Sequence, residues 1–253
     1  MSHPRNHRNG PCLVIFLSFF PTTAMTIAAT ATTQPALLTD LSLAYRLVNP
    51  TQATGAKRLL LLLHGVGGNE LNLLPVGEQL ADAHTLVLSV RAPLVFGPAG
   101  FGFYQVDFSS GRPVFNQAQQ LDGQRLLLSF MHEASATYGI PAGQVYLLGF
   151  SQGAIMAYDI ALTRPAQVRG VLAFSGRMLV ESRQHHAPAA DVKRVRFFLS
   201  HGRYDDKLPA FYADEAMTFL QTLGITPHYE AFEGGHEVSA SGLAAAHQWL
   251  AQQ

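Results

Sequence analysis

The sequence predicts an α/β domain with a mostly parallel central sheet and helices on both faces of the sheet. Strand-like and helix-like segments alternate along the chain, which is the pattern of such domains. Several strand-like segments are continuous apolar runs, as in strands buried on both faces. The 253 residues contain no internal repeat and no linker long enough to divide them, so we expect one domain over residues 36–253.

Residues 1–35 are expected to lie outside this domain. They combine a basic start, the apolar run Leu13–Phe20 and small residues ending at Ala29 and Ala31, which is the pattern of a signal peptide. Alternatively, translation begins at Met25 and the residues before it arise from the choice of start site. The first interpretation predicts a periplasmic or secreted protein and the second a cytoplasmic one. The apolar run is too short to span a bilayer.

The predicted strands differ in burial. Residues 41–48 alternate apolar and polar side chains, as in an edge strand with one face in water. Residues 58–64 form a leucine run that ends at His64 and suits a central strand. Further strands are expected at residues 85–90, 144–149, 168–176, 195–202 and 227–234.

Helices are predicted between these strands, where apolar residues recur every three or four positions. The longest covers Gln117–Tyr138, and Gly139 and Pro141 end it. The others are expected at residues 70–82, 155–162, 209–223 and 240–249. Residues 92–116 form a long irregular stretch with many aromatic residues, and loops of this length in compact domains are usually functional.

Composition excludes several classes of partner and cofactor. Seventeen basic and seventeen acidic residues balance, so neither a nucleic acid nor an anionic membrane surface is expected as a partner. Cys12 is the only cysteine, which leaves no disulfide within the chain and no cysteine cluster for a metal. A net charge near zero favours self-association, and a homodimer is the simplest form that this could take.

The segment Gly149–Gly153 fits the pattern G-x-S-x-G. In this motif a serine sits on a strained turn between a strand and a helix, and its hydroxyl oxygen is exposed. The context agrees, because a predicted strand ends at Gly149 and helical spacing follows Ser151. Ser151 is therefore the candidate nucleophile, and it needs a base and an acid to activate it.

The candidate acid and base follow two later strands. Asp205 and Asp206 lie in the loop after the strand that ends near His201, and His236 lies in the loop after the next strand. Ligand sites of open parallel sheets lie at the carboxyl ends of strands, so these loops are expected to converge with Ser151. A single loop aspartate is usually solvated and a single histidine structural, but all three at corresponding strand ends favour catalysis.

The leucine-rich strand delivers His64, Gly65 and Val66 to the same edge. There the main-chain N–H of Val66 and that of Gln152, which follows the nucleophile, are candidates to stabilise an oxyanion. Their side chains are expected to matter less than their positions. A phosphate-binding loop is the alternative, but no lysine follows these glycines at the required spacing.

These stretches together resemble the carboxylesterase/phospholipase family of α/β-hydrolases, which includes acyl-protein thioesterases and bacterial carboxylesterases. The similarity runs from about residue 41 to the end, in "LHGVGGNE", "RAPLVFGP", "GFYQVDF", "GFSQGAIMA", "HGRYDDKLP" and "GGHEVS". It implies the α/β-hydrolase fold and a serine hydrolase of esters or thioesters that uses no metal or cofactor. It also implies that Asp205, and not Asp206, is the acid. Leu208 replaces the valine frequent in the family, and the N-terminal extension lies outside the family pattern.

The substrate is expected to be a small-molecule ester with a short to medium acyl chain, as the resemblance suggests. Phe101, Phe103 and Tyr104 are the candidate residues for an acyl pocket. The loop also contains Phe96 and Phe108, and at least half of these five aromatic residues are expected to pack beneath it.

Other functions remain open. An acyl-protein thioesterase or a lysophospholipase would use the same site, and so would a peptidase or an acyltransferase. A peptidase of this architecture generally needs an extra domain, for which the chain has no spare length. A non-catalytic binding module is the alternative of another class. The adjacent His185 and His186 are expected in a solvated loop and not in a metal site.

Overall fold

The structure is a computed structural model that describes residues 34–48, 55–107, 109, 113–141 and 143–253. The chain divides into two compact units, residues 1–34 and 35–253, and the description below concerns the second. Residues 1–33 of the predicted signal-like segment, and Phe108 of the aromatic loop, lie outside the described residues.

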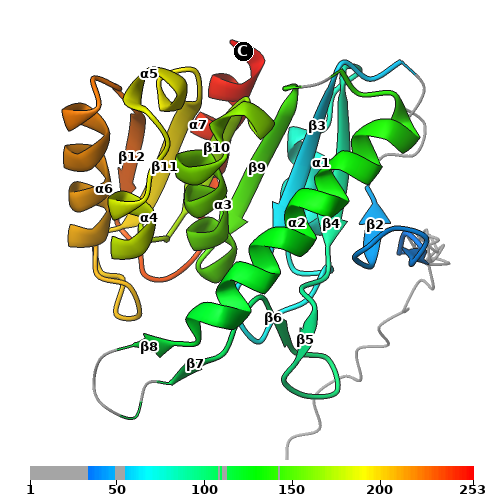
Figure 1. Cartoon of the computed structure of the whole chain (residues 1–253), viewed down its shortest axis with the longest axis horizontal. Coiled ribbons are helices and arrows are strands. Elements are labelled where there is room, and N and C mark those ends of the chain that lie inside the picture. Colours follow the sequence, from blue (N-terminus) through cyan, green and yellow to red (C-terminus); the bar gives the residue numbers. More distant parts are fainter. Residues whose placement is uncertain (1–33, 49–54, 108, 110–112, 142) are drawn as a thin grey trace, which may run out of the picture. The chain divides into compact units, whose positions relative to one another are not determined.

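Eight of the described strands form one large, mostly parallel sheet (Figure 1), as predicted. Within this sheet, only the pairings of β1 with β2 and of β2 with β4 are antiparallel. The strands are, in spatial order, β1 (Leu37–Leu38), β2 (Tyr45–Leu47), β4 (Thr85–Val90), β3 (Arg58–Leu63), β9 (Val145–Phe150), β10 (Gly170–Phe174), β11 (Arg196–Gly202) and β12 (His228–Phe232).

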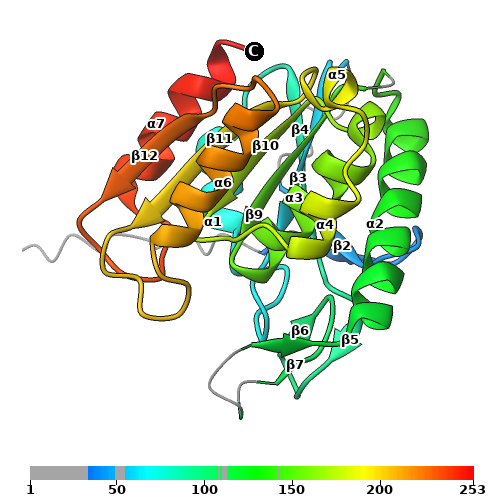
Figure 2. The same cartoon turned by 60° about the vertical axis from the view of Figure 1, so that its left-hand side comes forward.

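Helices cover both faces of this sheet (Figure 2). Two of them contribute to the core on one face, namely α1 (Leu74–Leu80) and α7 (Ala240–Ala251). The core on the opposite face includes residues of, or directly before, α2 (Gln117–Tyr138), α3 (Gln152–Thr163), α4 (Val180–Gln184), α5 (Ala189–Val192) and α6 (Phe211–Thr222). This arrangement is the α/β-hydrolase fold.

The leucine run of β3 shows why the strand lies at the centre. Successive side chains of a strand point to opposite faces, so the run fills both cores at once. Leu59, Leu61 and Leu63 pack in the core with α2 and α3, whereas Leu60 and Leu62 pack in the core with α1 and α7. All five are fully buried. The strand therefore fixes the position of its carboxyl end, where His64 and Gly65 begin the next loop.

Some predicted elements differ from the observed ones. β2 starts at Tyr45 and not at residue 41, and α1 starts at Leu74 because turns occupy the preceding residues. The stretch 92–116, predicted to be irregular, contains two small antiparallel pairs, whose strands are too short to show a periodic pattern. These strands are β5 (Leu94–Val95), β6 (Phe101–Gly102), β7 (Val106–Asp107) and β8 (Val114–Phe115).

Candidate active site

Ser151 occupies the sharp turn between β9 and α3. Its φ angle is 53°, in a region that residues other than glycine rarely adopt. The flanking glycine Gly153 explains how this turn is accommodated, because a Cβ atom there would lie 1.9 Å from the carbonyl oxygen of Leu63. The main-chain N–H of Ser151 donates to the carbonyl of Phe174 on β10, at 3.0 Å. The turn is thus held between the ends of three neighbouring strands.

His236 lies between Ser151 and Asp205. Its Nε2 atom is 2.9 Å from the Ser151 hydroxyl oxygen, and its Nδ1 atom is 2.7 Å from Oδ2 of Asp205. When Nδ1–H donates to the carboxylate, Nε2 is free to accept the proton of the serine hydroxyl. The ring of Phe150 packs beside the imidazole, with the two ring centroids 4.8 Å apart. The three residues that the sequence placed at separate strand ends therefore form one hydrogen-bonded series.

The two neighbouring aspartates have different surroundings. The Asp205 side chain is fully buried, and its Oδ1 atom accepts the main-chain N–H groups of Lys207 and Leu208 at 2.9 and 2.8 Å. The Asp206 side chain is 72% exposed and pairs with Lys207. Only Asp205 is hydrogen-bonded to His236. The loop thus holds one carboxylate against the imidazole and leaves the other in solvent.

The Gly65–Val66 peptide lies next to Ser151, since a Cβ atom on Gly65 would be 3.2 Å from Cβ of the serine. Buried His64 fixes the orientation of this peptide. Its Nε2 accepts the N–H of Ala92 at 3.1 Å, so its Nδ1–H donates to the carbonyl of Gly65 at 2.7 Å. Because a trans peptide directs its N–H away from its C=O, the N–H of Val66 points away from His64. Burial lowers the pKa of His64, which favours this neutral form.

The main-chain N–H groups of Val66 and Gln152 have no acceptor among the described residues. The side chain of Gln152 is more important than predicted. Its Oε1 accepts the N–H of Phe103 and its Nε2 donates to the carbonyl of Tyr104, both at 2.8 Å. This amide ties the start of α3 to the aromatic loop, so both its position and its side chain shape the site.

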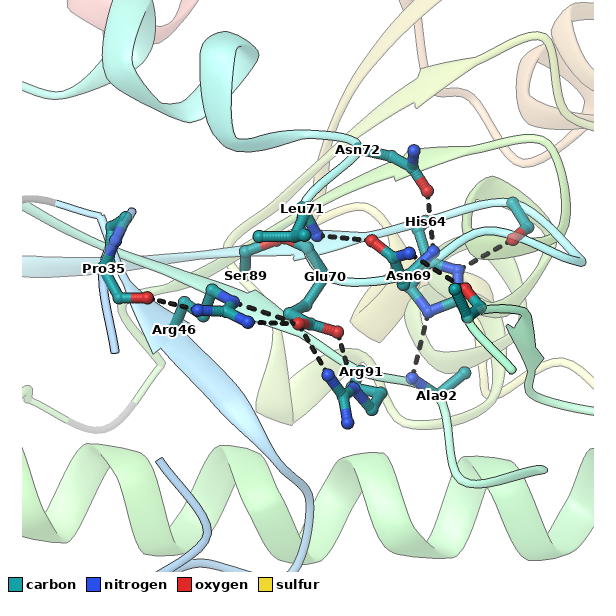
Figure 3. A network of polar contacts seen from close by, with 12 residues as sticks. Pro35, Arg46, His64, Asn69, Glu70, Leu71, Asn72, Ser89, Arg91 and Ala92 are labelled. Atoms are coloured by element: carbon teal, nitrogen blue, oxygen red, sulfur yellow. Dashed lines mark hydrogen bonds and ion pairs between the residues drawn. The ribbon is translucent and has the colours of Figure 1, made fainter. Parts of the chain in front are cut away.

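Glu70 anchors the loop that follows β3 (Figure 3). Its side chain is fully buried and lies between Arg46 and Arg91, which donate to its carboxylate at 2.6 to 3.0 Å. Burial alone raises the pKa of Glu70, but hydrogen bonds from Arg91, the main chain and Arg46 outweigh it and lower the pKa to about 2. Its main-chain carbonyl also accepts the hydroxyl of Ser89. The carboxylate therefore joins this loop to β2 and to the end of β4.

Replacing Glu70 with glutamine is expected to destabilise the fold by about 3 to 5 kcal/mol at pH 7, because two arginines lose their buried partner. The folded-state pKa lies below the unfolded one, so the carboxylate stabilises the protein above pH ~4.5 and loses this effect as the pH falls towards 2. The free energies of unfolding of wild type and variant, measured by urea titration, should therefore become more similar as the pH falls below ~4.5.

Asp122→Asn is the matched control, because Asp122 pairs with Arg125 on the exposed surface of α2. It should change the free energy of unfolding by less than about 1 kcal/mol. If both substitutions lowered the free energy of unfolding equally at pH 7, the role assigned to Glu70 would be wrong.

A cavity of about 390 Å³ opens beside Ser151. Its apolar wall includes Tyr104, Val106, Pro113, Ile155 and Leu208. Of the three aromatic residues predicted to bind substrate, only Tyr104 lines it.

The side chains of Phe101 and Phe103 hold the loop in place and do not line this cavity. Phe103 is fully buried and packs near the ring of His64, with centroids 5.8 Å apart. Phe101 lies under the guanidinium of Arg91, and its main chain bonds to Gly67 and Gly68 at 2.8 and 2.7 Å. The prediction that these two side chains bind substrate is corrected accordingly: they fix the loop beside the site.

No described group of histidine, cysteine, aspartate and glutamate side chains is arranged to hold a metal ion. His185 and His186 instead contact nearby main-chain carbonyls, those of Glu181 and Ala187. Among the helices that the structure describes, none has the length and apolar character needed to cross a membrane.

Several residues of this site carried little signal in the sequence. Glu70 is 24 and 21 residues from its two arginine partners, so no local spacing relates them. Arg177, which lines the cavity, follows β10 and belongs to no motif. Its place directly after the predicted strand at residues 168–176 was the one available indication, since such positions face ligand sites.

Comparison with known proteins defines the class and then the family. A carboxylesterase from Mesorhizobium loti has the same fold, with a TM-score of 0.74 and 25% identity over 87% of this chain and all of that one. The chain is thus an α/β-hydrolase of the ester-cleaving type. A family model for phospholipases and carboxylesterases matches residues 46–253, and the chain belongs to that family.

Two relatives illustrate the range of this similarity. "Putative hydrolase MhqD" of Bacillus subtilis (strain 168) is 28% identical over 76% of this chain and 91% of its own length. Acyl-protein thioesterase 1 of Kluyveromyces lactis is 26% identical over 68% of this chain and 79% of its own length.

Proposed function

We propose that the protein is a serine carboxylesterase that hydrolyses esters with short to medium acyl chains through Ser151, His236 and Asp205. The observation that carries this proposal is the hydrogen-bonded series from the Ser151 hydroxyl through His236 to the buried Asp205. The membership of the chain in a phospholipase/carboxylesterase family supports it. The adjoining cavity offers an apolar wall for the acyl chain.

The reaction would proceed in two steps. His236 Nε2 takes the hydroxyl proton while the oxygen of Ser151 attacks the ester carbonyl, and the proton then passes to the leaving alcohol as the ester C–O bond breaks. Water next attacks the acyl-enzyme, giving one proton to His236, and the acid leaves as Ser151 recovers that proton. Asp205 keeps Nδ1 as the donor and stabilises the imidazolium in both steps.

The main-chain N–H groups of Val66 and Gln152 would stabilise the oxyanion of each tetrahedral intermediate. Both amides lack an acceptor among the described residues, and Gly65 lies against Ser151. Donors fixed in advance stabilise charge that develops in the transition state without having to reorient. His64 would contribute indirectly, because it holds the Gly65–Val66 peptide in place.

The first test is the rate of hydrolysis of p-nitrophenyl esters from acetate to palmitate. Each buried CH₂ group contributes about 0.8 kcal/mol, so kcat/KM should rise about fourfold per added CH₂ while the chain still enters the cavity. With a cavity of about 390 Å³, the rate should peak between butyrate and octanoate and fall for palmitate.

A rate that increased up to palmitate would contradict the proposed chain length. A fluorophosphonate probe provides the control for catalysis itself, since it labels an activated serine whatever the acyl chain of the substrate. If the probe labelled the wild type and not Ser151→Ala, the serine mechanism would be supported even if the chain-length prediction failed.

A thioesterase is the second candidate, because a relative that covers most of the chain is named an acyl-protein thioesterase. The same nucleophile and base would attack a thioester carbonyl, and a thiol would leave instead of an alcohol. Hydrolysis of an octanoyl thioester faster than of the matched octanoyl ester would favour this candidate.

A further inference from the structure

The cavity beside Ser151 contains a positive charge that ester hydrolysis itself does not require. Arg177 follows β10, is partly buried, and lines this cavity together with Tyr104, Ser151 and His236. Its guanidinium lies over the ring of Tyr212 at the start of α6, 5.8 Å from the ring centroid. Contact with an aromatic face leaves the N–H groups at the edge of the guanidinium available to a ligand.

Within the described residues, the Arg177 side chain forms no ion pair and no hydrogen bond. Many other arginines of the protein have carboxylate partners, and these are Arg46, Arg58, Arg91, Arg125, Arg183, Arg194 and Arg203. The other two charged residues of the cavity outside the triad, Asp206 and Lys207, pair with each other at 3.0 Å. On the wall of the cavity, Arg177 is therefore a cation that has no counter-ion among the residues that the structure describes.

We propose that the substrate carries an anionic group, such as a carboxylate, and that Arg177 binds this group while the ester carbonyl lies at Ser151. The inference rests on the proposed function and adds the chemical class of its substrate, an acidic ester. A guanidinium presents parallel N–H donors that match the two oxygens of a carboxylate. Arg177 is thus a specificity-determining residue of the site.

The expected effect is a preference between substrates. Hydrogen bonds between charged partners in a partly desolvated cavity are worth more than neutral ones, so an anionic ester should react with a kcat/KM about 10- to 100-fold above that of its neutral counterpart. The preference should fall to about threefold or less in Arg177→Gln. Arg177→Lys should retain part of it, because a lysine keeps the charge but loses the paired geometry.

The test compares two matched pairs of esters, one for each side of the scissile bond. The acyl-side pair is mono-p-nitrophenyl adipate with p-nitrophenyl hexanoate, which have the same leaving group. The alcohol-side pair is m-carboxyphenyl hexanoate with m-carbamoylphenyl hexanoate, which have the same acyl group. A preference in one pair identifies the side of the ester that faces Arg177.

Arg196→Gln is the matched control. It removes one positive charge from the exposed start of β11, while the candidate site lies at the carboxyl ends of the strands. It should leave the preference for the anionic ester unchanged. If only Arg177→Gln lost this preference, the cause would be local and not the change in net charge.

Two results would overturn the inference: wild-type enzyme that hydrolyses the anionic and neutral members of both pairs equally, or Arg177→Gln that slows all four esters by the same factor. The second result would make Arg177 a structural residue. Failure of the proposed function gives a different result, because fluorophosphonate would then not label Ser151 and no ester would be hydrolysed in a serine-dependent manner.

Discussion

Replacing Ser151 with alanine is expected to lower kcat/KM for p-nitrophenyl butyrate by about 10⁵- to 10⁶-fold, the size of effect seen when the nucleophile of a triad is removed. Alanine lacks the oxygen that lies 2.9 Å from Nε2 of His236, so no acyl-enzyme can form. The remaining rate would come from the oxyanion donors and from substrate binding alone.

The fold should tolerate this change, because the substitution removes one atom from a turn that main-chain contacts hold in place. The free energy of unfolding should stay within about 1 kcal/mol of the wild-type value, as urea titration would measure. A folded Ser151→Ala protein that kept a tenth of the wild-type activity would exclude Ser151 as the nucleophile.

Asp205→Asn should lower kcat/KM by about 10⁴-fold, whereas Asp206→Asn should lower it by less than about threefold. In Asp205→Asn, the Oδ1 atom can still accept the two main-chain N–H groups of the loop, so the loop keeps its shape. The amide NH₂ group then faces Nδ1 of His236 and favours the tautomer in which Nε2 carries the proton. That tautomer cannot accept a proton from Ser151.

The neighbouring substitution controls for charge, since each variant loses one carboxylate from the same loop. Asp206 is exposed and pairs with Lys207, and surface pairs of this kind contribute little. Initial rates of both variants on one ester decide between the two aspartates. If Asp206→Asn were the more damaging change, the assignment of the acid would be wrong.

The parts of the site that the sequence predicts are those that follow strands with a clear pattern. Residues 59–63 are a buried leucine run, so the position of Gly65 at the carboxyl edge could be inferred. The same reasoning placed Ser151 and His236 at that edge, and the structure brings them within hydrogen-bonding distance. The ends of strands in a parallel sheet can be inferred from the local sequence, which is why these residues could be placed at one edge without the structure.

The parts that the sequence does not predict depend on contacts between distant segments. Glu70 and its partners Arg46 and Arg91 lie on different strands and loops, and nothing in their spacing relates them. The directions of the Phe101 and Phe103 side chains could not be predicted either, because the strands of this loop are too short to show a periodic pattern. The role proposed for Arg177 could be recognised only once the cavity was known, since a single arginine after a strand has many ordinary roles.

The turn at Ser151, the proposed nucleophile, also determines when activity can appear during folding. The turn needs β9 beside β3, a pairing that joins Leu59 to Val145, and it needs the carbonyl of Phe174 on β10. Parallel pairings between segments so far apart in sequence form slowly, because long chain loops must close first. A newly synthesised chain can therefore form much of its helical structure before it forms the turn that holds the proposed nucleophile. Hydrolysis would then report completion of the central sheet and not collapse of the chain.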